Sequence, residues 1–105
     1  MLTVMTPDLS IIVPLYNEED NVRPLVEAIA AALAPLPLAI ELLLVDDGSS
    51  DATFARALEL PRDGKPALRL LKLRRNYGQT AAMAAGIEHA RGRILVTLDG
   101  DLQND

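Results

Sequence analysis

Two carboxylates separated by one glycine follow the last apolar stretch of this sequence. Asp99 and Asp101 belong to the segment LVTLDGDLQND, which spans Leu95 to Asp105. Residues two apart in an extended chain point the same way, so these side chains face one side and repel each other. A divalent cation removes this repulsion, and Mg²⁺ and Mn²⁺ both accept carboxylate oxygens. The alternative interpretation is a simple turn, since aspartate and glycine favour turns in any case.

A second acidic pair, Asp46 and Asp47, stands in the stretch VDDGSSD. The residues from Ser49 to Asp51 can cap a following helix, but capping does not account for two carboxylates ahead of the glycine. A carboxylate there can accept hydrogen bonds from nucleobase N–H groups or from ribose hydroxyls. From these residues alone, a turn and a ligand site are equally open.

Two further stretches carry side chains suited to a nucleotide. In PLYNEE, Tyr16 can stack on a base and Glu18 supplies an acid. The plain alternatives are a boundary tyrosine and an acid that complements a helix dipole. In RRNYGQ, Arg75 precedes a predicted helix, whose N-terminus would attract phosphate. A solvated surface arginine is the other interpretation.

Four apolar runs predict the strands that position these stretches. They cover residues 9–15, 40–45, 68–73 and 94–98. The second and fourth are almost continuously apolar, which is typical of strands covered on both faces of a parallel sheet. Arg69 and Lys72 interrupt the third, which favours a place at the sheet edge.

Three helical patterns separate the strands. The first begins at about Asp20 or Asn21, because Pro24 is tolerated only in a first turn. The second begins near residue 50 or 51 and ends before residue 61. The third covers residues 78–91, with Gly92 as its C-cap and a run of small residues that predicts close packing on the sheet.

The alternation of strands and helices predicts an α/β fold. It indicates a parallel sheet of about four strands with three helices and right-handed crossovers. Ligands of such sheets bind beyond the carboxyl ends of the strands. The polar stretches after the first, second and fourth strands should therefore converge on one cleft.

Composition limits the classes of function. The chain has 105 residues, enough for one domain, and its net charge of −5 argues against nucleic acid as a partner. It has no cysteine, which excludes disulfides and thiolate metal sites. The longest uncharged apolar stretch, residues 28–40, is too short to span a bilayer, and the N-terminus lacks a signal-peptide pattern. We therefore expect a cytoplasmic chain without a transmembrane segment.

Taken together, four stretches closely resemble the family 2 glycosyltransferases with the GT-A fold. The four are SIIVPLYNEEDNV, ELLLVDDGSSDAT, RRNYGQTAAMAAGI and GRILVTLDGDLQ, in family order and over nearly the whole chain. RNYGQ and LDGDLQ are most similar to the branch that transfers sugars to polyprenyl phosphates such as dolichyl and undecaprenyl phosphate. The resemblance implies the Rossmann-like nucleotide-binding half of a GT-A fold, and residues 1–105 as the nucleotide-sugar-binding part of such a domain.

The resemblance implies a nucleotide role for five of the matching residues. Pro14, Tyr16 and Glu18 would contact the base and ribose of a UDP- or GDP-linked sugar. Asp47, with Asp46 beside it, would take the base edge. Arg75 is not among these five; its place before a predicted helix makes it a candidate for the phosphate side.

The resemblance also implies a metal site. Asp99 and Asp101 would form the metal-binding DxD pair for Mg²⁺ or Mn²⁺, with Gln103 as a further ligand. Asp99 would in addition touch the ribose or the diphosphate. The metal would neutralise the diphosphate leaving group, which is Lewis-acid catalysis.

Family members continue well beyond this motif, and their second half supplies the acceptor site and, in many, a carboxylate base. We therefore expect this chain to bind the donor only, with the catalytic base unknown. The polyprenyl phosphate acceptor would bind through a missing C-terminal part, at the cytoplasmic face of a membrane.

The residues alone also allow three other functions. The stretch LLLVDDGSSDATFARALEL looks like the start of a phosphorelay receiver domain, but a full β-α unit precedes it and no later strand supplies a lysine. Asp-x-Asp is also the nucleophile and acid pair of a class of phosphatases. The third is a non-catalytic nucleotide-binding fragment.

Overall fold

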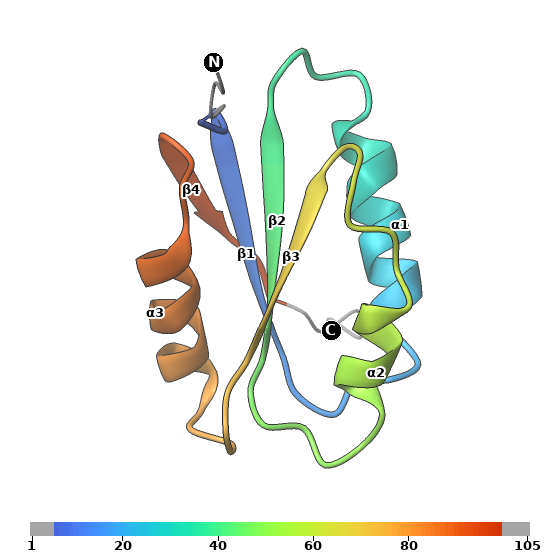
Figure 1. Cartoon of the computed structure of the whole chain (residues 1–105), viewed down its shortest axis with the longest axis vertical. Helices are drawn as coiled ribbons and strands as arrows, with labels where there is room; N and C mark the ends of the chain where they lie inside the picture. Colours follow the sequence, from blue (N-terminus) through green and yellow to red (C-terminus); the bar gives the residue numbers. More distant parts are fainter. Residues whose placement is uncertain (1–5, 100–105) are drawn as a thin grey trace, which may run out of the picture.

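The chain folds into a parallel four-stranded sheet with helices on both faces (Figure 1). The computed structural model describes residues 6–99. This arrangement confirms the predicted α/β fold. The strands are β1 (Leu9–Leu15), β2 (Ile40–Asp46), β3 (Ala67–Lys72) and β4 (Ile94–Thr97). The helices are α1 (Val22–Leu33), α2 (Thr53–Leu58) and α3 (Gln79–His89).

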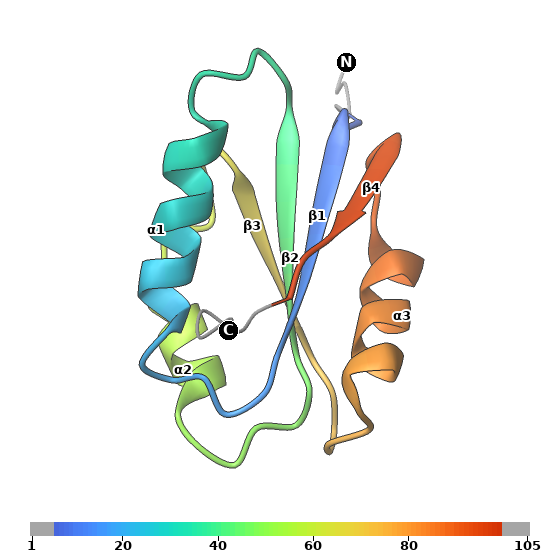
Figure 2. The same ribbon diagram turned by 180° about the vertical axis from the view of Figure 1, so that it is seen from behind.

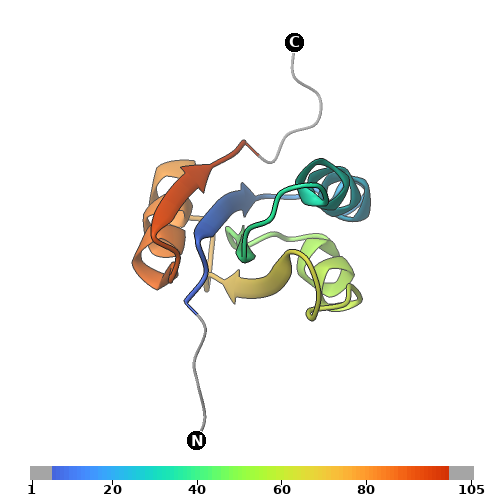
Figure 3. The same ribbon diagram turned by 90° about the horizontal axis from the view of Figure 1, so that it is seen from above.

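Strands are added to the sheet on both sides of β1. The strand order is β3-β2-β1-β4, so β2 and β3 add on one side of β1 and β4 adds on the other. Right-handed crossovers in opposite directions place their helices on opposite faces. Accordingly α1 and α2 cover one face and α3 covers the other (Figure 3). The carboxyl ends of β1 and β4 therefore flank the point where open α/β sheets bind their ligands.

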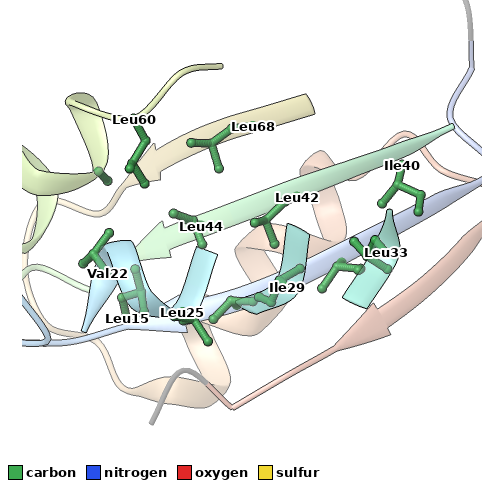
Figure 4. Packing of buried hydrophobic residues seen from close by; sticks show 13 residues of the cluster. Leu15, Val22, Leu25, Ile29, Leu33, Ile40, Leu42, Leu44, Leu60 and Leu68 are labelled. Atoms are coloured by element: carbon green, nitrogen blue, oxygen red, sulfur yellow. The ribbon is translucent and has the colours of Figure 1, made fainter. Parts of the chain in front are cut away.

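Side chains that alternate along β1 and β2 divide the core into two layers. The larger layer lies between the sheet and the helices α1 and α2, which lie together on one side of the sheet in the reverse view of Figure 2. It includes Leu15, Leu42 and Leu44 (Figure 4). The smaller layer, under α3, consists of Ile12, Leu43, Val45 and Ala82. Odd-numbered residues of β2 and even-numbered residues of β1 therefore face α3.

Small residues let α3 approach the sheet closely, as predicted. A Cβ added to Gly86 would lie 2.4 Å from Cγ2 of Ile12 and 3.1 Å from Cγ2 of Val45. Real carbon atoms do not come that close, so a side chain here would push the helix outward.

Several sequence-based expectations need correction. Helix α2 begins at Thr53, later than predicted, with Ala52 at its N-cap position. Gly92 does not cap α3, whose C-cap is Ala90. All four residues of β4 are exposed in the described part of the chain, so the expected cover on both faces is absent there. The edge position expected for the third strand is confirmed by β3.

Candidate functional site

A pocket of about 320 Å³ lies at the carboxyl ends of the strands. The loops after β1, β2 and β3 all lie at this end of the sheet (Figure 1). The first strand and its loop contribute Pro14, Leu15, Tyr16 and Glu18. The remaining lining residues are Asp47, Asn76, Gly78, Gln79 and Asp99.

Asp47 is the buried acid of this pocket, with 2% of its surface exposed. Its Oδ1 accepts a hydrogen bond from the backbone N–H of Tyr77 at 2.8 Å. Its Oδ2 accepts from the N–H of Gly78 at 3.0 Å and from Nδ2 of Asn76 at 3.1 Å. This carboxylate therefore holds the segment that leads into α3 against the end of β2.

The glycine after Asp47 allows that contact. Gly48 has a φ of +65°, and a Cβ built on it would lie 2.1 Å from the backbone carbon of Arg75. Both the left-handed backbone and the lack of space require glycine here. The loops after β2 and β3 thus touch backbone to backbone at the pocket rim.

A hydrogen-bonded frame joins the loop after β1 to the loop after β2. Oδ1 of Asn17 accepts from the backbone N–H of Ser50 at 2.8 Å, and Oγ of Ser49 accepts from the N–H of Asn17 at 2.9 Å. The N–H of Glu18 donates to Oγ1 of Thr53 at 2.8 Å. These bonds fix the backbone between Tyr16 and Glu18, so that both side chains reach the pocket from a rigid loop.

The pocket offers an aromatic ring beside acceptors. Tyr16 is 47% exposed although it lines the pocket, so its ring is accessible to a ligand. Oε2 of Glu18 accepts from Nδ2 of Asn21 at 2.6 Å, which orients that carboxylate. A flat, apolar ring next to oriented carboxylates suits a nucleoside, because a base can stack while its N–H and hydroxyl groups donate.

Asp46 lies away from this pocket. It is 3% exposed and alternates with Asp47, which places its side chain on the sheet face that α1 and α2 cover. Its Oδ1 accepts from the N–H of Ser49 at 3.3 Å, and its Oδ2 is buried without a hydrogen-bond partner in the described residues. The structure therefore separates the two acids that the sequence places side by side.

Arg75 also stands outside the set of pocket-lining residues. Its guanidinium lies 4.9 Å from the centre of the Tyr77 ring, and both side chains are exposed. What does reach the pocket is the start of α3, through Gly78 and Gln79 together with Asn76. Sequence reasoning named none of these three as ligand contacts, although a helix N-terminus facing the cleft was expected and was the available signal.

For the metal site, the structure describes one of the three predicted ligands. Asp99 lines the pocket, whereas Asp101 and Gln103 lie outside the described residues. Within residues 6–99 no group of three or more potential ligands gathers as a metal cluster. The acids around the pocket, Glu18, Asp47 and Asp99, are oxygen donors of the kind that hard divalent cations prefer.

The helices of residues 6–99 are at most 12 residues long. None of α1, α2 and α3 is long and apolar enough to cross a membrane.

Known proteins match nearly the whole chain. The model of "Glycosyl transferase family 2" matches residues 10–105. A dodecaprenyl-phosphate galacturonate synthase of Rhizobium johnstonii is 56% identical over 103 residues, which cover 97% of this chain and 30% of the relative. An undecaprenyl-phosphate 4-deoxy-4-formamido-L-arabinose transferase of Sodalis glossinidius is 46% identical over 108 residues, which cover 99% of this chain and 32% of the relative. The chain thus spans about 30% of the length of these curated relatives.

Solved structures share the architecture. S. aureus TarS 1-349 in complex with UDP has a TM-score of 0.76 and 27% identity, and the match covers 90% of this chain and 27% of that one. The mannosyltransferase PcManGT from Pyrobaculum calidifontis, solved with GDP-Man and Mn²⁺, has a TM-score of 0.71 and 26% identity, with 92% and 28% covered.

Proposed function

Because this chain belongs to glycosyltransferase family 2, we propose that its pocket binds the nucleoside diphosphate of a sugar donor. The observation that carries the proposal is the convergence of Tyr16, Glu18, Asp47 and Asp99, from three separate strands, on one pocket. A receiver domain and an Asp-x-Asp phosphatase account less well for the exposed tyrosine ring in that pocket and for the family match.

Each side of the pocket has a task in this proposal. The ring of Tyr16, with Pro14 beside it, stacks on the base, and Asp47 accepts from the base edge. Glu18 accepts from ribose hydroxyls. The N-terminus of α3, from Gln79 onward, faces the phosphates with its N–H groups, since the N–H of Gly78 already donates to Asp47. Asp46 serves the site indirectly, because it holds the turn at Ser49, and Arg75 remains a candidate at the phosphate side.

The acids after β4 complete the site. Asp99 and, by the sequence motif, Asp101 and Gln103 would hold Mg²⁺ or Mn²⁺. A cation held by these residues would neutralise the charge that develops on the departing diphosphate. Because Asp99 itself lines the pocket, it would contact ribose or diphosphate as well.

The reaction proposed for the whole enzyme is transfer of the sugar from a UDP- or GDP-linked donor to a polyprenyl phosphate. A phosphate oxygen of the acceptor forms a bond to the anomeric carbon, and the bond from that carbon to the diphosphate breaks. A phosphate monoester has a second pKa of about 6, so the acceptor is already anionic at neutral pH. The reaction therefore needs little help from a protein base, and residues 1–105 supply the donor side.

Such an acceptor is a lipid, so we propose that the whole protein works at the cytoplasmic face of a membrane. The relatives' names support the lipid acceptor, since they combine a sugar with dodecaprenyl or undecaprenyl phosphate. Residues 1–105 would be the nucleotide-sugar-binding part of that larger protein.

Titration of the chain with UDP and with GDP tests the donor site. Tyr16→Ala should weaken binding of the preferred nucleotide by about fivefold or more, because stacking of one base on an aromatic ring contributes about 1–3 kcal/mol. Leu58→Ala is the control, since Leu58 is also 47% exposed but lies on α2, outside the residues that line the pocket. Equal affinities of wild type and Tyr16→Ala would overturn the placement of the base.

A further inference from the structure

A buried charge lies at the opposite end of the sheet from the pocket. Glu41 is 2% exposed and stands near the start of β2, six residues before Asp47. At about 3.3 Å per residue, this is roughly 20 Å from the proposed base site. A carboxylate buried this deeply is costly unless it is paired, and the proposed function does not use it.

Glu41 is fully paired, and its partners come from three other elements. Oε2 accepts from Oγ of Ser10 at 2.5 Å and from the backbone N–H of Arg91 at 2.7 Å. Oε1 accepts from Nη1 of Arg69 at 2.8 Å. Burial raises the pKa of Glu41, but these hydrogen bonds and the charge of Arg69 outweigh it, so the pKa lies below its ordinary value.

The same cluster holds the corner between α3 and β4. Oγ of Ser10 accepts from the backbone N–H of Gly92 at 2.7 Å, across 82 residues of sequence. A Cβ added to Gly92 would lie 2.5 Å from that oxygen and 2.6 Å from the backbone nitrogen of Ser10. The corner is therefore fitted closely onto β1, two residues before β4 begins.

The side chains of β4 do little to fix its own register. Ile94, Leu95 and Val96 are apolar whichever face they take, and all are exposed in the described structure, at 63%, 42% and 37%. A strand without an apolar–polar alternation specifies its register weakly. Yet the register matters, since a shift by one residue would turn Leu98 toward the face that Asp99 now shares with Pro14.

We propose that Glu41 is a positioning residue: together with Ser10 it clamps the backbone at Arg91 and Gly92, sets the register of β4 on β1, and thereby brings Asp99 to the pocket. Its consequence for donor binding rests on the proposed function, whereas its effect on β4 does not.

Hydrogen exchange in the full chain tests the clamp directly. The N–H groups of Ile94 and Leu98 donate to the carbonyls of Asp8 and Ile12 at 3.1 and 2.9 Å, so their exchange reports the β4 ladder. Glu41→Gln keeps the size of the side chain and removes the charge. It should speed exchange of these two amides by about tenfold relative to amides of β1 and β2.

Leu60→Ala is the matched control, because Leu60 is buried in the layer under α1 and α2 and does not contact the corner. It should speed exchange in all strands in proportion. If Glu41→Gln affects β4 no more than β1 and β2, or if Leu60→Ala gives the same selective loss, the clamp is refuted.

Nucleotide titration separates this inference from the proposed function. Glu41→Gln should lose most of the increase that Mn²⁺ gives to nucleoside diphosphate affinity, while its metal-free affinity for the nucleoside stays within twofold of wild type. Full retention of the Mn²⁺ effect in Glu41→Gln would also overturn the positioning role. Absence of any Mn²⁺ effect in wild type would instead count against the proposed function, and the exchange result would still decide the role of Glu41 on β4.

Discussion

The carboxylate of Asp47 serves two partners at once in the proposed site. It accepts hydrogen bonds from the segment 76–78, and it is proposed to accept from a nucleobase. A carboxylate has about four acceptor positions, so three protein donors leave room for one more. The protein donors would also hold the oxygen that meets the base in a fixed place.

Asp47→Asn should therefore weaken binding of the free nucleoside without metal by about tenfold or more. The amide replaces a charged acceptor, and a hydrogen bond to a charged group is worth about 1.5–3 kcal/mol. Calorimetric titration measures the loss, with Asp63→Asn in the exposed segment 61–65 as a control that should bind like wild type. Wild-type affinity in Asp47→Asn would show that the base lies elsewhere.

Substitutions of Asp99 and Asp101, the two acids of the DGD motif, should differ from Asp47→Asn because they change the metal dependence of binding. Asp101→Asn should abolish the gain in diphosphate affinity from Mn²⁺ or Mg²⁺ and leave metal-free nucleoside binding nearly unchanged, because in the proposed site Asp47, which follows β2, accepts from the base. Asp99→Asn should act in the same direction but less cleanly, since Asp99 also lines the nucleoside pocket.

Titrations of nucleoside and nucleoside diphosphate, each with and without Mn²⁺, check this division. If the motif were only a turn, asparagine would replace aspartate without effect on the metal dependence. An unchanged metal effect in Asp101→Asn would then remove the metal site and much of the case for glycosyl transfer.

At the level of elements, the sequence is informative wherever apolar residues form a continuous run or recur at helical spacing. Runs of apolar residues located all four strands to within one or two residues, and Pro24 placed the start of α1 near Asn21. Local patterns were less informative where tertiary contacts decide. Gly92 looks like a helix cap in the sequence, but glycine is required there because the backbone passes close to Ser10.

The candidate site also has parts that the sequence predicts and parts that only tertiary contacts determine. The motifs predicted that Pro14, Tyr16, Glu18, Asp47 and Asp99 would meet, because parallel strands open at one edge, and these five line one pocket. The pattern could not separate Asp46 from Asp47, since only the pairing of the strands shows which side chain faces α3. It also missed Asn76, whose place depends on a hydrogen bond to Asp47 over 29 residues.

Strand β4 leaves an apolar edge exposed in the described part of the chain. Ile94 is 63% exposed, and β4 has β1 as its only neighbour in the sheet described here. Such edges pair with other chains unless a charge blocks them. The 105-residue chain should therefore self-associate at micromolar concentration, and Ile94→Lys should reduce this association.

Sedimentation velocity over a concentration series measures this association. The matched control is Leu58→Lys, which places the same charge at a residue that is 47% exposed on α2. Monodisperse monomer in the wild type, or equal relief by both lysine variants, would contradict a role of the β4 edge.

For the whole molecule, Glu41 connects elements that the sequence separates widely. Its network joins β1, β2, β3 and the corner before β4, so it contributes to the global stability of the fold in addition to its larger local effect on β4. Its pKa is lowered from 4.5, and that of Asp51 is lowered from 3.8, where hydrogen bonds from Thr53 and Glu19 outweigh burial. Both carboxyls therefore bind protons more tightly in the unfolded chain.

The sign of the pH dependence follows from these two directions. A carboxyl with a lowered pKa adds stability that is fully present above its unfolded pKa and is lost as the pH falls through its folded pKa. The free energy of unfolding should therefore fall as the pH drops below about 4.5. Glu41→Gln should be less stable than wild type at pH 7, and the difference should shrink toward pH 3 as Glu41 takes up a proton.

Urea unfolding at several pH values between 3 and 7 measures this difference. Leu60→Ala again serves as the control, because a buried leucine does not titrate and its loss should lower the stability by the same amount at every pH. A gap between wild type and Glu41→Gln that stays constant across this range would mean that the charge of Glu41 does not stabilise the fold. In that case the loss of stability in Glu41→Gln would come from poorer hydrogen bonds with Ser10, Arg69 and Arg91, and not from the missing charge.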